Sequence, residues 1–92
     1  MWPFSSRKDR PLPHVAVVVY SRANCPLCDE ARHFLDDERM RLGFTLRVVD
    51  IDAEPQLKSM YDHCVPVVEV AGKERFRGRI NPVLWSRLMR AL

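Results

Sequence analysis

The stretch VAVVVYSRANCPLC, residues 15–28, is the most informative part of this sequence about its fold. Residues 15–20 form a continuous, mostly β-branched run of strand length, which is typical of a central strand covered on both faces in a parallel or mixed sheet. From residue 26 to residue 42 apolar residues recur at helical spacing, and Gly43 supplies a C-terminal stop. The chain therefore runs from a strand, through a short loop, into an amphipathic helix that begins at two cysteines.

The middle of the sequence predicts two further strands and a short helix. Residues 44–49 alternate as a second strand that runs into a polar turn. Glu54-Pro55 opens the short helix, because proline is favoured in a first helical turn. Residues 65–70 form the third strand, with Pro66 at its start, where a strand tolerates a residue without an N–H.

The end of the sequence predicts a hairpin followed by a helix. Residues 71–73 form the turn and residues 74–78 a short antiparallel strand, since the connection is too short for a crossover. Asn81 then caps a helix that has Pro82 in its first turn. We expect the inner face of this helix to carry Leu84, Trp85, Leu88 and Leu92. The order β-α-β-α-β-β-α predicts an α/β fold with a four-stranded mixed sheet flanked by helices on both sides.

Length and composition limit the class of protein. The 92 residues provide material for one core, so a multidomain architecture is excluded. Apolar residues make up 47% and charged residues 29% of the chain, and no run approaches the ~20 apolar residues that span a bilayer. The net charge of +3 is too small to indicate nucleic acid binding by itself. We therefore expect a soluble globular protein with no membrane partner.

Residues 1–14 are expected to form an extended N-terminal arm before a domain over residues 15–92. Their prolines and charged residues are typical of a partly ordered segment, and Trp2 and Phe4 either pack on the domain surface or contact a partner. The arm lacks the continuous hydrophobic segment and the cleavage site of a secretory signal. We therefore expect a cytoplasmic protein.

The chain has three cysteines, Cys25, Cys28 and Cys64, which are too few and odd in number for the disulfide framework of a small secreted domain. Cys25 falls at or near the N-cap of the first helix, where unpaired N–H groups and the helix dipole commonly lower a cysteine pKa below about 7.5. Cys28 lies one turn further in, on the same side of the helix and closer to the core. This placement predicts that Cys25 is the nucleophile and that Cys28 attacks the mixed disulfide at Cys25 to release the reduced substrate.

The chain carries, in order, a strand, the stretch 20–28, the turn 50–52, Leu57, Tyr61 and Val65-Pro66-Val67. This combination resembles the glutaredoxin-like proteins of the thioredoxin fold and extends from Val15 to Leu92. The resemblance implies a dithiol oxidoreductase with a redox-active disulfide between the two cysteines of the CxxC motif. It also implies a role in electron transport and cell redox homeostasis.

The resemblance implies the residues that surround the dithiol. Pro66 is expected in the cis form, in a loop that faces the cysteine pair and keeps metal away from the sulfurs. The carbonyl and N–H of Val65 are expected to pair with the extended backbone of a substrate. Pro26 and Leu27, between the cysteines, belong to the same substrate site, with Leu27 where the family usually has an aromatic residue.

The resemblance also implies contacts to glutathione as a cosubstrate, with no tightly bound cofactor. Arg22 stands where glutaredoxins usually have a lysine that binds the glycine carboxylate of glutathione, and an arginine can pair with a carboxylate through two hydrogen bonds. In glutaredoxins a turn before the last helix holds the γ-glutamyl end of glutathione, and Gly78 matches a glycine of that turn. Arg77 or Arg79 is expected to replace a missing contact to a carboxylate there.

The sequence leaves more than one function open. The first is a thiol–disulfide oxidoreductase that reduces protein or glutathione mixed disulfides, with glutathione or a reductase as electron donor. The alternative is a thioredoxin-fold binding module that carries zinc or an iron–sulfur cluster, or that docks a partner with vestigial thiols. Nucleic acid is not favoured as a partner, because Arg75, Arg77 and Arg79 are expected to share one strand face without stacking aromatics.

Cys64 has three interpretations from the sequence alone. It is a small buried apolar residue, a third redox thiol that exchanges with Cys25 or pairs between molecules, or a metal ligand together with the cysteine pair and His63. His33 is expected to be solvated on the first helix rather than catalytic. Asp29 is expected to stabilise the first helical turn rather than to act as a base.

Overall fold

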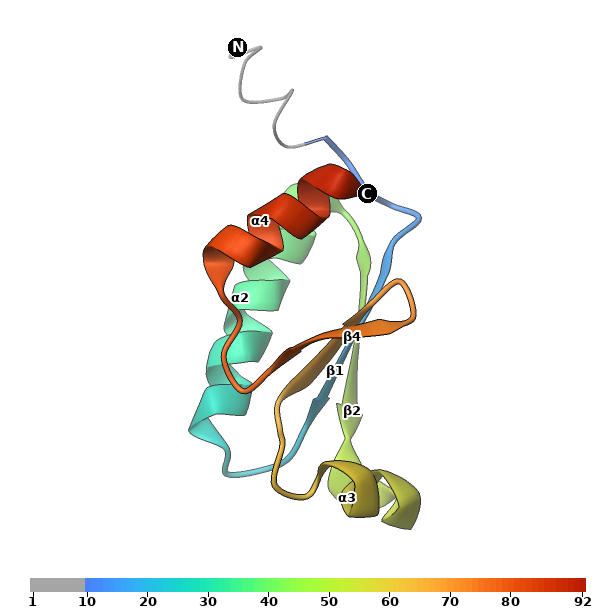
Figure 1. Cartoon of the computed structure of the whole chain (residues 1–92), viewed down its shortest axis with the longest axis vertical. Helices are drawn as coiled ribbons and strands as arrows, with labels where there is room; N and C mark the ends of the chain where they lie inside the picture. The colour runs from blue at the N-terminus through green and yellow to red at the C-terminus, as the bar shows by residue number, and fades with distance from the viewer. Residues whose placement is uncertain (1–9) are drawn as a thin grey trace.

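The computed structural model describes residues 10–92, and its elements follow the predicted order (Figure 1). The elements are β1 (Ala16–Ser21), α2 (Pro26–Leu42), β2 (Thr45–Asp50), η1 (Ile51–Ala53), α3 (Pro55–Tyr61), β3 (Val67–Val70), β4 (Lys73–Arg77) and α4 (Pro82–Ala91). The cap at Asn81 is confirmed, since its side-chain oxygen accepts from the N–H groups of Val83 and Leu84. Gly43 ends α2 with a φ of 80°, which glycine adopts without steric cost.

The four strands form one mixed sheet in the order β2-β1-β3-β4. β1 pairs in parallel with β2 and antiparallel with β3, so its predicted central position is confirmed. β3 and β4 form an antiparallel hairpin around Ala71 and Gly72, which both have positive φ. Such a two-residue turn matches the right-handed twist of the strands it joins.

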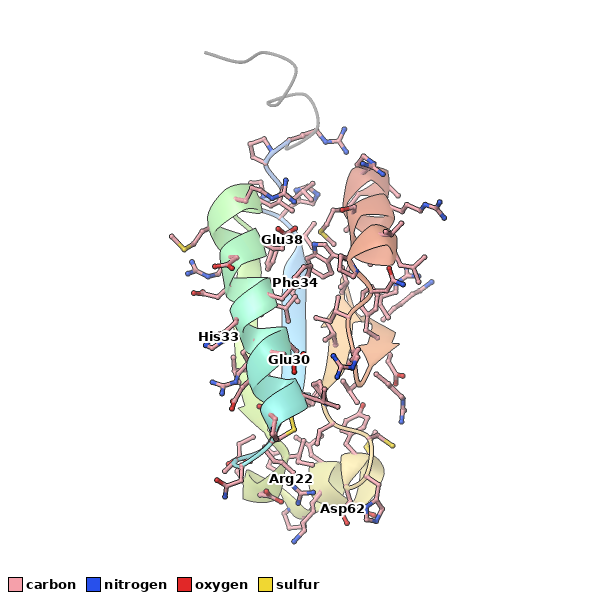
Figure 2. All side chains as sticks on the ribbon, turned by 90° about the vertical axis from the view of Figure 1, so that its left-hand side faces the viewer. Arg22, Glu30, His33, Phe34, Glu38 and Asp62 are labelled. Carbon is pink, nitrogen blue, oxygen red and sulfur yellow. A yellow bond between two sulfur atoms is a disulfide. The ribbon has the colours of Figure 1, made fainter. Side chains whose placement is uncertain are left out.

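Helices α2 and α4 lie on the same face of the sheet and enclose the main core (Figures 1 and 2). Trp85 of α4 is fully buried, and its ring contacts those of Phe34, Phe44 and Phe76 at centroid distances of 5.7, 5.7 and 6.1 Å. Its indole N–H donates to Glu38 of α2 at 2.8 Å. This cluster joins both helices to the sheet, because its aromatic rings come from α2, α4, β4 and the residue before β2.

Helix α3 covers the opposite face of the sheet at one end only. Tyr61 packs there with Ile51 and Val67. The ring centroids of Tyr20 and Tyr61 lie 4.9 Å apart. The prediction that the first strand is covered on both faces therefore holds only near the carboxyl end of β1. Ala16, at the other end of the strand, is exposed, because α3 is too short to reach it.

The inner face of α4 differs from the sequence prediction at two positions. Leu84 is 51% exposed, whereas Met89 is 5% exposed and belongs to the core. Trp85 points into the core, and Met89 lies one turn beyond it on the same side of the helix. Leu84 is turned about 100° away from Trp85 around the helix axis.

Residues 10–14 lie against the domain. Leu12 is buried in the main core, and its N–H donates to the carbonyl of Leu42 at 2.8 Å. The Arg10 guanidinium donates to the Leu92 carbonyl at 2.9 Å. Trp2 and Phe4 lie outside the described residues. Within residues 10–92, no helix combines the length and the apolar character needed to cross a membrane.

Candidate functional site

The sheet topology brings three chain segments to one end of the molecule. Ser21 at the end of β1 pairs with Asp50 at the end of β2, because carboxyl ends of parallel strands meet at one sheet edge. Tyr20 pairs with Val67 at the start of the antiparallel β3. The loop before α2, the η1 turn and the loop before β3 therefore meet at this end, which we call the redox end.

The two cysteines of the motif occupy different environments at the start of α2. Cys25 is the N-cap residue, half-buried, and its Sγ accepts a hydrogen bond from the Cys28 N–H at 3.2 Å. Cys28 is fully buried. The two sulfurs are joined in a disulfide, with the Cα atoms 5.2 Å apart, which is visible as a yellow bond at the start of α2 (Figure 2). The accessible cysteine is therefore the one that the helix terminus would stabilise as a thiolate.

The loop before β3 has the backbone geometry that the family resemblance implies. The Val65–Pro66 peptide bond is cis, Pro66 is buried, and its carbonyl accepts from the Gly78 N–H at 2.8 Å. Val65 is half-buried, and within residues 10–92 its own N–H and carbonyl enter no backbone hydrogen bond. An extended peptide can therefore pair with this residue without displacing a partner strand.

Arg22, three residues before Cys25, is held by two aspartates. Its guanidinium forms a bidentate pair with Asp52 at 2.6 and 3.1 Å and donates to both the carboxylate and the carbonyl of Asp62 at 3.0 and 2.8 Å. Figure 2 shows Arg22 and Asp62 side by side at the lower end of the molecule. The hydrogen bond from Arg22 lowers the pKa of Asp52, and the same bond raises the pKa of Arg22. Neither aspartate is predicted from the sequence as a partner of Arg22, since they lie 30 and 40 residues away from it along the chain.

A groove of about 500 Å³ runs beside the CxxC motif. It is lined by Leu27, Phe34, Gly78 and Arg79 among others, so it brings together three of the expected substrate-binding residues. Arg79 pairs across it with Glu30 of α2 at 3.2 Å. Figure 2 shows Glu30 and Phe34 on the side of α2 that faces α4, whereas His33 points away from it. Leu27 from α2 and Gly78 and Arg79 from the segment after β4 therefore line one groove beside the disulfide.

The alternation that predicts one shared face for Arg75, Arg77 and Arg79 is interrupted in β4. A β-bulge leaves Arg75 without a partner residue opposite it, because Val68 pairs with Phe76 and Glu69 pairs with Glu74. The bulge places Arg77 on the same side as Glu74, and the two pair through two hydrogen bonds. These bonds lower the pKa of Glu74 and raise that of Arg77. Arg79 lies beyond the strand.

Cys64 is a free, half-buried thiol two residues before the cis-proline. It packs against the cluster of Ile51, Tyr61 and Val67 under α3. His63 beside it is exposed and lies 3.5 Å from the Asp62 carboxylate. Among residues 10–92, no group of three or more His, Cys, Asp and Glu side chains is placed to hold a metal ion.

Comparison with known proteins identifies the family of this chain. Residues 16–87 match the model of the glutaredoxin-like domain (DUF836). The solution structure of protein Ne2328 from Nitrosomonas europaea is 28% identical, with a TM-score of 0.69 over 80% of this chain and 89% of that one. The crystal structure of protein XcR50 from X. campestris is 27% identical, with a TM-score of 0.67 over 83% and 97% of the two chains.

More distant structures confirm the fold. A thioredoxin variant from Halobacterium salinarum is 16% identical, with a TM-score of 0.64 over 95% of this chain and 77% of that one. The element order and mixed sheet are thus those of the thioredoxin-like fold. The chain belongs to the glutaredoxin-like domain family.

Proposed function

We propose that this protein is a thiol–disulfide oxidoreductase that reduces protein disulfides or glutathione mixed disulfides through Cys25 and Cys28. One observation carries the proposal: an accessible cysteine caps a helix, and its buried partner lies one turn further in. The expected setting is a reducing compartment such as the cytoplasm, where structural disulfides are rare and a CxxC pair is more often catalytic or metal-binding.

The reaction begins with both cysteines reduced. The Cys25 thiolate, stabilised by the start of α2, attacks one sulfur of the substrate disulfide, and the other sulfur leaves as a thiol after taking up a proton. Cys28 then loses its proton and attacks Cys25 Sγ, which breaks the mixed disulfide and releases the second substrate thiol. Two electrons pass to the substrate, and the protein ends in the disulfide form that the structure shows.

The surrounding residues would orient the substrate for this attack. The backbone groups of Val65 lack a backbone partner within the described residues and are suited to pair with an extended substrate segment. Pro66 holds this loop with its carbonyl bound to Gly78. Pro26 and Leu27, together with the groove at Gly78 and Arg79, would contact the side chains of the substrate. A protein reductase or glutathione would return the disulfide to the dithiol.

The test is reduction of a model mixed disulfide by three single variants. Cys25→Ser should abolish thiol release, because no other cysteine is a helix N-cap. Cys28→Ser should still attack the substrate but accumulate a covalent adduct at Cys25, detected by mass spectrometry. Cys64→Ser is the matched control and should react at the wild-type rate. Equal rates for Cys25→Ser and the wild type would refute the proposal.

A further inference from the structure

Three arginines around the dithiol are paired with carboxylates of the same chain. Arg22 directs four hydrogen bonds to Asp52 and Asp62, and its side chain is 25% exposed. A guanidinium has five N–H donors, so this fork is nearly filled. Arg77, which lies opposite Val67 beside the cis-proline loop, makes two hydrogen bonds to Glu74, and Arg79 at the groove makes one to Glu30.

The redox end also carries an excess of negative charge. Residues 50–63 contain four carboxylates and one lysine, and Arg22 adds a single positive charge from the loop before α2. A disulfide that brings its own carboxylates to Cys25 would meet repulsion from this segment. It would also have to displace Asp52 or Asp62 to bind Arg22. A disulfide in a neutral or basic protein segment meets neither cost.

Within the proposed function, on which this inference rests, we propose that Asp52 and Asp62 are specificity-determining residues. By occupying Arg22 they direct Cys25 towards disulfides of neutral or basic protein segments and against small disulfides that carry carboxylates, such as glutathione disulfide. The same Arg22 would bind a substrate carboxylate if the two aspartates released it. The chain thus contains an arginine that could bind a substrate carboxylate, but its own two aspartates occupy that arginine.

The experiment compares three small disulfides as oxidants of the reduced protein: anionic glutathione disulfide, neutral hydroxyethyl disulfide and cationic cystamine. Rates are followed by quenched flow and labelling of the remaining thiols. The variant combines Asp52→Asn with Asp62→Asn. We expect the ratio of the glutathione disulfide rate to the hydroxyethyl disulfide rate to rise by about two- to fivefold, the size of a partly exposed ion pair. The cystamine ratio should fall.

Two further variants separate the role of Arg22 from general charge. Glu54→Gln is the control for the loss of a single exposed carboxylate at the same end, and Glu54 makes no side-chain cap hydrogen bond. It should change the ratio much less than the double variant. Adding Arg22→Gln to the double variant should remove the gain for glutathione disulfide, since the freed cation is then absent.

The outcomes distinguish this inference from the proposed function. If hydroxyethyl disulfide oxidises the wild type but the double variant keeps the wild-type ratio, or merely equals Glu54→Gln, the inference is wrong and the proposed function stands. If none of the three disulfides oxidises the wild type, the proposed function fails and the inference fails with it. The neutral disulfide also reports whether each variant retains an intact site, because its rate enters every ratio.

Discussion

At the scale of single residues, the chemistry of Cys25 and Arg22 depends on the groups that lie beside each of them. Cys25 gains its position from the N-cap of α2, a local feature that its sequence context predicts. Arg22 gains its partners from segments 30 and 40 residues away. Its local sequence therefore indicates only a cation in a loop. The folded structure shows that two carboxylates pair with this cation.

The pairing of Arg22 with Asp52 should make stability depend on pH. The pKa of Asp52 is lower in the folded protein than its ordinary value of 3.8, because Arg22 donates hydrogen bonds to its carboxylate. A lowered folded-state pKa stabilises the fold above the ordinary value and loses that contribution as pH falls through the folded value. Arg22→Gln should therefore be less stable than the wild type at pH 5–7, and the difference should shrink between pH 4 and pH 2.

Urea midpoints at pH 7, 5, 3 and 2 check this expectation. Arg87→Gln is the control, because Arg87 is exposed on α4 at the other end of the molecule from Asp52. Its midpoint should follow the wild type at every pH. If the difference in urea midpoint between Arg22→Gln and the wild type stays constant down to pH 2, the ion pair does not stabilise the fold as described.

At the scale of elements, helix α4 shows how far an apolar pattern determines a buried face. Its sequence is apolar on more than one side, so the pattern supports several orientations of the helix on the sheet. The Trp85 contacts with three phenylalanines and with Glu38 select one of them. Met89 is then buried and Leu84 is left exposed.

Paired substitutions in α4 test this orientation. Met89→Ala should lower the free energy of unfolding by about 2–4 kcal/mol, because it removes buried contacts and leaves a cavity. Leu84→Ala should change it by less than about 0.5 kcal/mol, since the side chain is half exposed. Chemical denaturation of both variants gives the comparison. A larger effect at Leu84 than at Met89 would show that the helix packs through its other side.

At the scale of the whole molecule, the segment before β1 and the end of α4 close the main core far from the dithiol (Figure 1). Leu12 enters that core from the segment before β1, and Arg10 bonds the carbonyl of Leu92 at the C-terminus. The redox end is built separately, around Ile51, Tyr61 and Val67. A destabilising substitution in the main core should therefore lower the global stability of the protein without changing the geometry of the redox end directly.

Substitution of Leu12 tests this division. Leu12→Ala should lower the free energy of unfolding by about 2–5 kcal/mol, as is usual for a buried leucine. In the fraction that stays folded, Cys25 should react with hydroxyethyl disulfide at the wild-type rate. His14→Ala, an exposed neighbour, serves as the control and should leave both quantities unchanged. A slower Cys25 reaction in folded Leu12→Ala would show that the two ends are coupled.

Sequence patterns alone predict the elements, their order and the two cysteines at a helix start, because periodicity, capping and turn residues act over a few neighbouring positions. The folded structure determined which residues meet: Asp52 and Asp62 pair with Arg22, Glu30 pairs with Arg79, and the bulge places Arg77 beside Glu74. It also decided that α3 covers only one end of the outer sheet face. These features depend on how helices and strands pack, and no local pattern encodes the distance between residues that are 30 to 49 positions apart.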